Sequence, residues 1–304
     1  MVVLSNGSAV SMEPWHSSVP VILEGWLLGQ AGGSATADLL TGAKAPAGKL
    51  AETLPARLED TPAHGNFPGE SGTVRYGEGL LIGYRWYDTR DVPVVFPFGR
   101  GLTYGTVELG ELEEKGSDTT AVVRATITNR SDRAVRDVVQ VYVHDVDSSV
   151  FRPEQELGGF AAVTLKAGAS ERVEVTLDPE AFAYWHLGEK RWVIEGGDFE
   201  IRVGLSSRDI RAKEVVALQG EQIPVTLAPE STTDAWLEHP VAGPRLREKL
   251  NSAPGGDATL AMLDDPAFGR MMRAIPLVRL SRFPGSPLDE AELPELAREF
   301  NARS

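Results

Sequence analysis

The sequence predicts three segments in succession: an α/β segment built on a parallel sheet with helices, an all-β sandwich, and a helical C-terminal extension. Three observations predict this division. A short apolar run is followed by helical patterns, apolar and polar residues then alternate along several short runs, and the last part combines helical patterns with many prolines. We place the three segments at residues 1–105, 106–220 and 221–304.

The first segment has the patterns of strands and helices that pack on one another. Residues 2–4 are apolar and fit the end of a buried strand, after which Ser5 begins a turn. Between residues 19 and 28 the apolar side chains recur at i, i+3 and i+4, which predicts a helix lying on a sheet. A second helix is predicted from Ser34 to Gly42. A strand followed by helices favours α/β architecture, and because the chain opens within a strand we expect further strands upstream.

The second segment alternates with a period of two, as strands do when one face is buried. The positions predicted to face the core are Val123, Ala125 and Ile127; Val139, Val141 and Val143; Val173, Val175 and Leu177; and Phe199, Ile201, Val203 and Leu205. Turn-forming sequences rich in Asn, Asp, Gly and Ser separate these runs. Several short alternating strands of this kind predict a β-sandwich.

The third segment is predicted to be helical. Trp236 and Leu237 suit one short helix, and residues 246–250 suit another. Ser286 offers a helix N-cap, followed by a proline at the first helical position and an acidic residue at the third. Because prolines interrupt the segment repeatedly, we expect a tail that wraps around other parts of the protein and has no core of its own.

The stretch from Tyr76 to Tyr104 is expected to join the α/β segment rigidly to the sandwich. Its aromatic residues are Tyr76, Tyr84, Trp86, Tyr87, Phe96, Phe98 and Tyr104. Aromatic side chains bury large areas and dominate interface energetics, whereas a flexible linker would be polar and rich in Gly and Ser. The preceding residues 59–79 are rich in Gly and Pro, which predicts a long loop.

Composition and charge exclude several classes of function. The net charge of −14 repels phosphate backbones and anionic membrane surfaces, so we expect neither nucleic acid nor membrane as a partner, whereas neutral sugars are compatible. No apolar run approaches the ~20 residues of a membrane-spanning helix. The chain has no cysteine, and its first residues do not form a signal-peptide pattern, which together favour a cytoplasmic location.

The sequence also predicts neither a metal nor a cofactor. The histidines, His16, His64, His144, His186 and His239, lie far apart without metal-ligand spacing. Residues 29–34 are rich in glycine but lack the Lys-Ser/Thr ending of a P-loop, so we interpret them as a tight turn.

A set of motifs runs through the first two segments. In order they are VVLSNGSAV at residues 2–10, EGWLLGQAGG at 24–33, PAGKL at 46–50, TLP at 53–55, YGEG at 76–79, GYRWY at 83–87, FPFGRGLTY at 96–104, ELGGF at 156–160 and AYW at 183–185. Their order and spacing resemble the C-terminal region of family 3 glycoside hydrolases of the β-glucosidase type, over about residues 1–218. The sequence departs from the family at Ala31, where glutamate is usual, and at Ala47, where serine is commoner.

The resemblance implies a fold and a chemistry. Residues 1–105 would be the C-terminal half of the family's α/β sandwich domain, and residues 106–220 its fibronectin-type-III-like module. The family hydrolyses O-glycosidic bonds with retention, using two carboxylates about 5 Å apart. Its nucleophilic aspartate lies in a Ser-Asp-Trp-like stretch on an N-terminal β/α-barrel, and its acid/base glutamate precedes the strand represented here by residues 2–4. No Ser-Asp-Trp sequence occurs here, so we assign no catalytic residue and expect the chain alone to be inactive.

Three residues are candidates for contact with a sugar substrate: Glu78, Tyr84 and Trp86. Glu78 lies in a loop rich in groups that bind sugars, but it could instead hold that loop in place. If residues 84–87 alternate as in a strand, Tyr84 and Trp86 point to one side and Arg85 and Tyr87 to the other. One pair would then pack in the core. A structural role and a ligand contact therefore stay open for each candidate.

The favoured function is the C-terminal portion of a retaining β-glucosidase-like hydrolase that acts on a β-linked glucoside or oligosaccharide, with its barrel missing from this chain. A rival is a non-catalytic carbohydrate-binding or adhesion module. That function needs exposed aromatic residues on the sandwich, for which Tyr142, Tyr184, Trp185 and Trp192 are the local candidates. A third possibility is a complete subunit that assembles with a separate barrel chain. The oligomeric state stays open.

Overall fold

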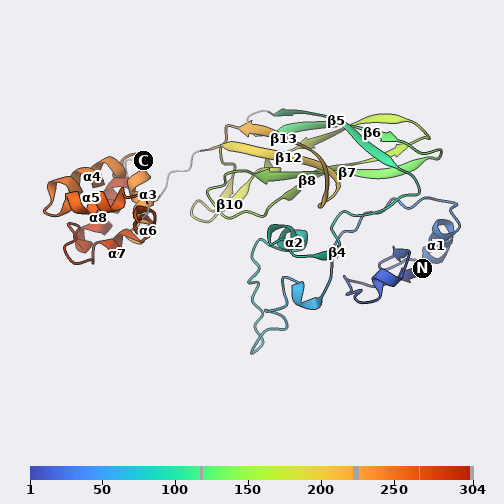
Figure 1. Cartoon of the computed structure of the whole chain (residues 1–304), viewed down its shortest axis with the longest axis horizontal. Coiled ribbons are helices and arrows are strands. Elements are labelled where there is room, and N and C mark those ends of the chain that lie inside the picture. Colours follow the sequence, from blue (N-terminus) through green and yellow to red (C-terminus); the bar gives the residue numbers. More distant parts are fainter. Residues whose placement is uncertain (117–118, 222–225, 267, 302–304) are drawn as a thin grey trace. The chain divides into compact units, whose positions relative to one another are not determined.

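The structure, a computed structural model, describes residues 1–116, 119–221, 226–266 and 268–301. The chain divides into two compact units, Met1–Glu221 and Gln222–Ser304, and each is described by itself (Figure 1). The first unit contains a segment of short strands and helices followed by a β-sandwich, and the second unit is helical. This order confirms the predicted fold class.

The first 104 residues contain short elements connected by long loops. They are β1 (Val2–Leu4), β2 (Ile22–Glu24), α1 (Gly32–Leu40), β3 (Leu54–Pro55), α2 (Tyr84–Thr89) and β4 (Val94–Phe96), with 3-10 turns at His16–Ser18 and Leu58–Asp60. β1 and β2 pair in parallel, whereas β3 and β4 pair antiparallel. A parallel pair needs a crossover connection, as expected of an α/β segment.

The helix predicted between residues 19 and 28 is wrong, because the middle of this stretch is the strand β2. Ile22 lies opposite Val2 of β1. The chain then turns at Trp26, whose φ is 53° and whose backbone N–H donates to the Glu24 carboxylate at 2.8 Å. Apolar residues in a strand followed by a turn have the same spacing here as a helix face, and pairing with β1 decides between the two.

The second predicted helix is confirmed as α1, although it begins at Gly32 and not at Ser34. A Cβ on Gly32 would lie 2.6 Å from the Cβ of Leu28, so the chain can enter the helix here only with glycine. Gly42 follows the helix with a φ of 75°, the left-handed conformation that commonly ends helices.

Two antiparallel sheets form the sandwich. One has the strand order β13–β12–β7–β8 and the other β5–β6–β9. Their bounds are β5 (Val107–Gly116), β6 (Ala121–Asn129), β7 (Val135–Asp145), β8 (Glu156–Leu165), β9 (Ser170–Leu177), β12 (Gly197–Ser206) and β13 (Asp209–Leu218). A separate hairpin consists of β10 (Tyr184–His186) and β11 (Arg191–Val193). The predicted β-sandwich is confirmed.

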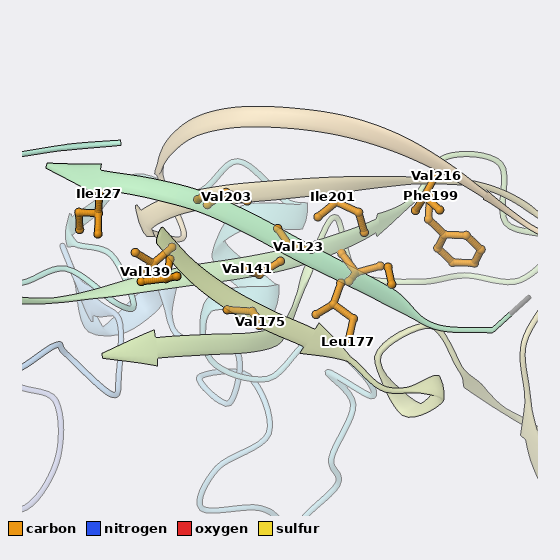
Figure 2. Close-up of a cluster of buried hydrophobic side chains, with 14 of the residues drawn as sticks. Val123, Ile127, Val139, Val141, Val175, Leu177, Phe199, Ile201, Val203 and Val216 are labelled. Carbon is orange, nitrogen blue, oxygen red and sulfur yellow. The ribbon is translucent and has the colours of Figure 1, made fainter. Parts of the chain in front are cut away.

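Apolar side chains from both sheets fill the space between them (Figure 2). β6 shows the alternation most regularly, since every second residue from Ala121 to Asn129 is buried. The predicted core residues are all buried except Leu205, which is partly exposed. Burying a Val, Leu, Ile or Phe side chain stabilises the fold by about 1.5–3 kcal/mol, so this cluster is the main source of the sandwich's stability.

Residues 226–301 have a hydrophobic core of their own. Their elements are α3 (Thr233–Glu238), α4 (Ala242–Ser252), α5 (Gly256–Leu263), α6 (Gly269–Arg273), α7 (Leu277–Leu280), a 3-10 turn at Glu290–Glu292 and α8 (Leu293–Asn301). Trp236 is fully buried, its indole N–H donates to the Ala228 carbonyl at 3.0 Å, and its ring meets Phe300 edge-on. The expected wrapping tail without a core is therefore wrong. Prolines such as Pro240 lie between helices, where they end a helix without disturbing its packing.

The last helix also begins later than Ser286, where its N-cap was predicted. Leu288 is buried in the core, so the chain reaches the helix start only after this residue. Asp289 then caps the turn that leads into α8, because its carboxylate accepts a hydrogen bond from the backbone N–H of Ala291 at 2.9 Å.

A motif with a period of 13 residues builds three of the helix junctions in this unit. In each copy a leucine is followed by a glycine: Leu237 and Gly243, Leu250 and Gly256, Leu263 and Gly269. The leucine lies in the last turns of one helix and is buried, and the glycine lies at the start of the next. A Cβ on these glycines would lie 2.1, 1.6 and 2.4 Å, respectively, from the carbonyl oxygen of the paired leucine. The junctions α3–α4, α4–α5 and α5–α6 therefore require glycine, because the helices meet through their backbones.

Residues 105–221 expressed alone are expected to unfold cooperatively, whereas residues 1–104 alone are expected to aggregate. The buried cluster of the sandwich lies within β5 to β13, while residues 1–104 expose large apolar side chains such as Leu27, Phe67 and Ile82. Urea denaturation and light scattering of the two fragments check this. A monomeric fragment 1–104 with a cooperative transition of its own would contradict the prediction.

Candidate functional site

The candidate residues Tyr84 and Trp86 lie on the helix α2, so the strand-like alternation expected for residues 84–87 is wrong. Gly83 precedes the helix with a φ of 55°, and this left-handed residue turns the chain into it. Tyr87 is buried, and Tyr84 and Trp86 are half-buried. Helical geometry therefore directs the two candidates to different surroundings.

Tyr84 packs where α2 meets the sandwich. Its ring stacks on Phe98 with centroids 4.5 Å apart and meets Tyr142 of β7 edge-on at 6.0 Å. Its hydroxyl oxygen accepts a hydrogen bond from the backbone N–H of Leu157 on β8 at 2.6 Å. Burial raises the pKa of Tyr84 above its usual value. These contacts give Tyr84 a structural role whether or not it also touches a ligand.

The side chain of Gln140 connects the chain after β4 to the sandwich. Its amide nitrogen donates to the carbonyls of Gly99 and Leu205, each at 2.9 Å, and its amide oxygen accepts from the Tyr142 hydroxyl at 2.6 Å. Burial raises the pKa of Tyr142, so its hydroxyl stays a donor. Gly99 has a φ of 78°, and a Cβ there would lie 2.0 Å from the Gln140 amide oxygen. A side chain at residue 99 would therefore break this connection.

Ion pairs complete the junction. Lys49 Nζ lies 2.6 Å from Asp137 Oδ1 of β7, with both side chains largely buried, and it also donates to the Gly101 carbonyl. Arg208 pairs with Asp88 of α2 at 2.7 Å. Charged groups from the two segments thus neutralise one another at their contact.

The aromatic packing expected between Tyr76 and Tyr104 is present at the centre of this stretch and absent at its ends, while the rigidity of the junction stays a prediction. Tyr84 and Phe98 make the contacts described above. Tyr76 and Tyr104, in contrast, are 82% and 43% exposed. Tyr104 still makes one contact through its hydroxyl group, which donates to the Leu39 carbonyl of α1 at 2.6 Å.

Glu78 and Trp86 lie in unlike environments. The Trp86 indole N–H donates to the Asp60 carbonyl at 3.0 Å, and the Arg90 guanidinium lies 4.5 Å from its ring centroid. The hydrogen bond holds the loop onto α2, whereas Arg90 is the C-cap residue of α2 itself, and both contacts favour a structural role. Glu78 is half-buried, and its Oε2 is buried without a hydrogen-bond partner among the described residues. A buried carboxylate oxygen without a donor is costly, which leaves Glu78 the strongest of the three candidates for an external ligand.

A hollow of about 530 Å³ opens on the surface of residues 1–104. Its wall is mostly apolar and includes Pro55, Leu58, Ile82, Tyr84 and Phe98. Among the predicted site residues it contains Tyr84, whereas Glu78 and Trp86 do not line it.

Two charged residues outside the three candidates also line this hollow: Arg85, which the sequence analysis considered beside Tyr84, and Glu52, which it did not consider. The Glu52 carboxylate accepts a hydrogen bond from the backbone N–H of Ala9, and Arg85 pairs with Glu156 at 3.2 Å. Glu52 stands between the PAGKL and TLP motifs, and this position was the signal available in the sequence.

No group of three or more His, Asp or Glu side chains in the described part of the chain is placed to hold a metal ion. No helix among the described residues is long and apolar enough to cross a membrane.

Phe98→Ala is expected to lower the free energy of unfolding by about 2–3 kcal/mol, less than the ~3–5 kcal/mol of a fully buried ring, because Phe98 is only half-buried. The variant also loses the stacking contact with Tyr84. Urea denaturation measures the change. Phe151→Ala, which removes a ring that is 64% exposed, serves as the control and should shift the midpoint little. Equal midpoints for Phe98→Ala and the parent would show that the junction is not a packed element.

Comparison with known proteins identifies two parts of the first unit. Residues 1–104 match the Glycosyl hydrolase family 3 C-terminal domain, and residues 137–207 match the Fibronectin type III-like domain. The crystal structure of the GH3 β-glucosidase of Bifidobacterium adolescentis is 47% identical and superposes with a TM-score of 0.75, covering 81% of this chain and 37% of that one. The fold and these matches assign the two parts of the first unit to the C-terminal domain and the fibronectin type III-like domain of family 3 glycoside hydrolases.

The curated relatives extend the likeness to the helical unit. The exo-α-(1→6)-L-arabinopyranosidase of Bifidobacterium breve is 44% identical over 89% of this chain, and the thermostable β-glucosidase B of Acetivibrio thermocellus is 40% identical over 99% of it. The chain spans only 36% and 40% of the lengths of these two relatives. It corresponds to the C-terminal region of family 3 glycoside hydrolases of the β-glucosidase type.

Proposed function

We propose that this chain completes the fold, and one wall of the sugar site, of a retaining glycosidase that hydrolyses β-linked glucosides or oligosaccharides, with both catalytic carboxylates outside the chain. The observation that carries the proposal is the continuous match to thermostable β-glucosidase B, which covers almost all of this chain but 40% of the relative. The remainder of such a protein, including the predicted N-terminal β/α-barrel, would supply the nucleophile and the acid/base.

The surface of residues 1–104 has features that suit this role. It carries the apolar hollow and the buried Glu78 oxygen, which has no donor among the residues that the structure describes. Sugar hydroxyls are hydrogen-bond donors, and a carboxylate accepts from them in strong charge-assisted bonds. Retaining hydrolysis needs a substrate held firmly between two carboxylates, so positioning groups on an adjacent wall contribute to the rate.

The test is a chimera in which residues 1–304 replace the matching region of thermostable β-glucosidase B. The chain alone should hydrolyse an aryl β-glucoside no faster than buffer, because loss of a catalytic carboxylate removes several orders of magnitude in rate. The chimera should turn over at a rate typical of enzymes, about 1–10³ per second. Turnover at that rate by the chain alone would overturn the placement of the carboxylates. A folded but inactive chimera beside an active parent would overturn the proposed wall.

Glu78 can be tested within the same chimera. Glu78→Gln should raise KM about tenfold, the loss of one charge-assisted hydrogen bond, while Tm stays close to that of the chimera. Glu59→Gln, at an exposed acidic residue of the same segment, is the control. A lower Tm with unchanged KM would assign Glu78 a structural role only. Parallel Tyr84→Phe and Trp86→Phe variants test the other two candidates by the same two measurements.

A second candidate substrate is an α-L-arabinopyranoside. The arabinopyranosidase of Bifidobacterium breve is slightly more similar to this chain than β-glucosidase B is, with 44% against 40% identity. Assaying the chimera with both aryl glycosides decides which substrate this wall favours.

We also propose that the natural partner is a barrel, which a separate chain could supply. The location that we propose is the cytoplasm, because the chain has no cysteine.

A further inference from the structure

The hairpin β10–β11 lies at one end of the sandwich (Figure 1). It carries two exposed tryptophans on one face. Trp185 and Trp192 lie directly opposite each other in the register of the two strands, and they are 47% and 62% exposed. The neighbouring pair, Tyr184 and Val193, faces the other way, and Val193 is buried. Outward positions of a strand usually carry polar residues, so packing of the sandwich does not explain two indoles there.

The two indoles form a right-angled pair, with centroids 5.7 Å apart and planes inclined at 79°. In this arrangement the ring that contributes its edge keeps both faces clear of its partner. Neither indole N–H has a hydrogen-bond partner in the described part of the chain, whereas the N–H groups of Trp86 and Trp236 donate to carbonyl oxygens. Trp185 and Trp192 thus offer a ligand both an aromatic face and hydrogen-bond donors.

The hairpin is held at both of its ends. At the turn end, Arg191 donates two hydrogen bonds to the Glu221 carboxylate, at 2.9 and 2.7 Å, and at the base the Glu221 backbone N–H donates to the Ile194 carbonyl at 2.7 Å. The turn is closed by a hydrogen bond from the Lys190 N–H to the His186 carbonyl at 2.8 Å. Aromatic groups placed on a rigid base lose little conformational entropy when they bind.

We propose that Trp185 and Trp192 form a binding platform for a neutral chain of pyranose sugars, in which one sugar ring lays its C–H face on an indole. The size of the patch favours this ligand over a protein. A stable protein interface needs about 800 Å² on each side, from roughly 20–30 residues, whereas the outward apolar residues of the hairpin are these two tryptophans and Leu187.

Charge favours the same ligand. A net charge of −14 repels polyanions, and beside the indoles the charges of Glu189, Lys190 and Arg191 nearly balance, which suits a neutral ligand. Choosing gluco-oligosaccharides as the first probes rests on the proposed function, whereas the platform itself does not.

The test is a titration of the full chain with cellotetraose, laminaritetraose, xylotetraose and an arabinopyranosyl oligosaccharide. Binding is followed by the indole N–H resonances in NMR spectra, assigned with Trp185→Phe and Trp192→Phe, and by calorimetry. We expect the resonances of these two residues to shift, with a Kd on the order of 0.1–1 mM for at least one sugar. Trp185→Ala and Trp192→Ala should weaken binding about tenfold, and Trp192→Phe should weaken it less because phenylalanine keeps an aromatic face.

Phe160→Ala is the matched control, since it removes an exposed ring from β8, outside the hairpin. The platform is overturned if none of the four sugars shifts the two indole resonances at about 10 mM, or if Phe160→Ala weakens binding as much as Trp192→Ala does. It is also overturned if the parent dimerises and Trp192→Ala abolishes the dimer, because the patch is then an interface between copies. No step involves hydrolysis, so an inactive chimera combined with sugar binding here would reject the proposed function alone.

Discussion

Asp137→Ala is expected to lower the free energy of unfolding of the first unit by about 3–5 kcal/mol. Asp137 is 6% exposed at its side chain and lies 2.6 Å from the ammonium of Lys49, which is 13% exposed. Removing the carboxylate leaves that ammonium buried with the Gly101 carbonyl as its remaining partner. The cost of the uncompensated charge, rather than the attraction of the pair itself, makes the effect large. Urea denaturation of the full chain measures it.

The double variant Lys49→Met/Asp137→Leu separates the charge effect from packing. Because it removes both charges and keeps similar volumes, it should lose less stability than Asp137→Ala alone. Glu108→Ala breaks an exposed ion pair with Arg130 and should cost no more than about 1 kcal/mol. If Asp137→Ala and Glu108→Ala lower the free energy of unfolding by the same amount, the Lys49–Asp137 pair is not a buried element of the junction.

Gly256→Ala is expected to unfold the helical unit. The added Cβ would lie 1.6 Å from the Leu250 carbonyl oxygen, far inside contact distance, and the obstacle is backbone that cannot rotate away. Relieving the clash requires the junction between α4 and α5 to open, which exposes the buried Leu250 and Leu263. A unit of this size has a total stability of only about 4–11 kcal/mol, so losing one junction removes most of it. Hydrogen exchange measured by mass spectrometry over residues 233–301 checks the prediction.

The other two glycines of the repeat predict a ranking of effects, and Gly33 of α1 provides a control. Gly243→Ala and Gly269→Ala place the Cβ 2.1 and 2.4 Å from the paired carbonyl oxygen, so their effects should be large but smaller than that of Gly256→Ala. Gly33→Ala adds a Cβ in α1 with no atom within 4 Å, and it should leave stability unchanged or improve it slightly. Wild-type exchange rates in Gly256→Ala would mean that the helices do not meet through these glycines.

The sandwich could be predicted from its sequence because its burial is local and regular. In β6, from Ala121 to Asn129, inward and outward residues alternate without exception. The alternation of residue types in the sequence therefore predicts which side chains are buried. Two stretches of the first segment whose secondary structure was predicted wrongly show no such alternation. Residues 19–28 and 84–87 are short, and their apolar residues fit a helix or a strand equally well. Pairing with β1 decided the first and the left-handed Gly83 the second.

The sequence provided candidate site residues, whose role stays a prediction, but not the contacts that they make. Motif resemblance led to Glu78, Tyr84 and Trp86, yet of these only Tyr84 lines the hollow, together with the unpredicted Glu52. Long-range contacts decide such arrangements, as when Leu157 of β8 donates its N–H to the Tyr84 hydroxyl. The helical unit illustrates the opposite case. Its repeat of leucine and glycine is visible in the sequence. The reason for the glycines is visible only in the structure, where the leucine carbonyl oxygens lie too close to each glycine to admit a Cβ.

The sequence by itself determined the order of the three segments, the β-sandwich with its inward residues, and the likeness to family 3 glycoside hydrolases. These follow from periodicity and motif spacing, which are patterns among residues close together in the sequence. The tertiary structure alone decided that residues 226–301 have their own core, that Lys49 meets Asp137, and that Trp185 and Trp192 stand together on an exposed face. Each of these depends on which surfaces meet when the chain closes on itself, and side-chain burial and charge pairing between distant residues decide that only in the folded protein.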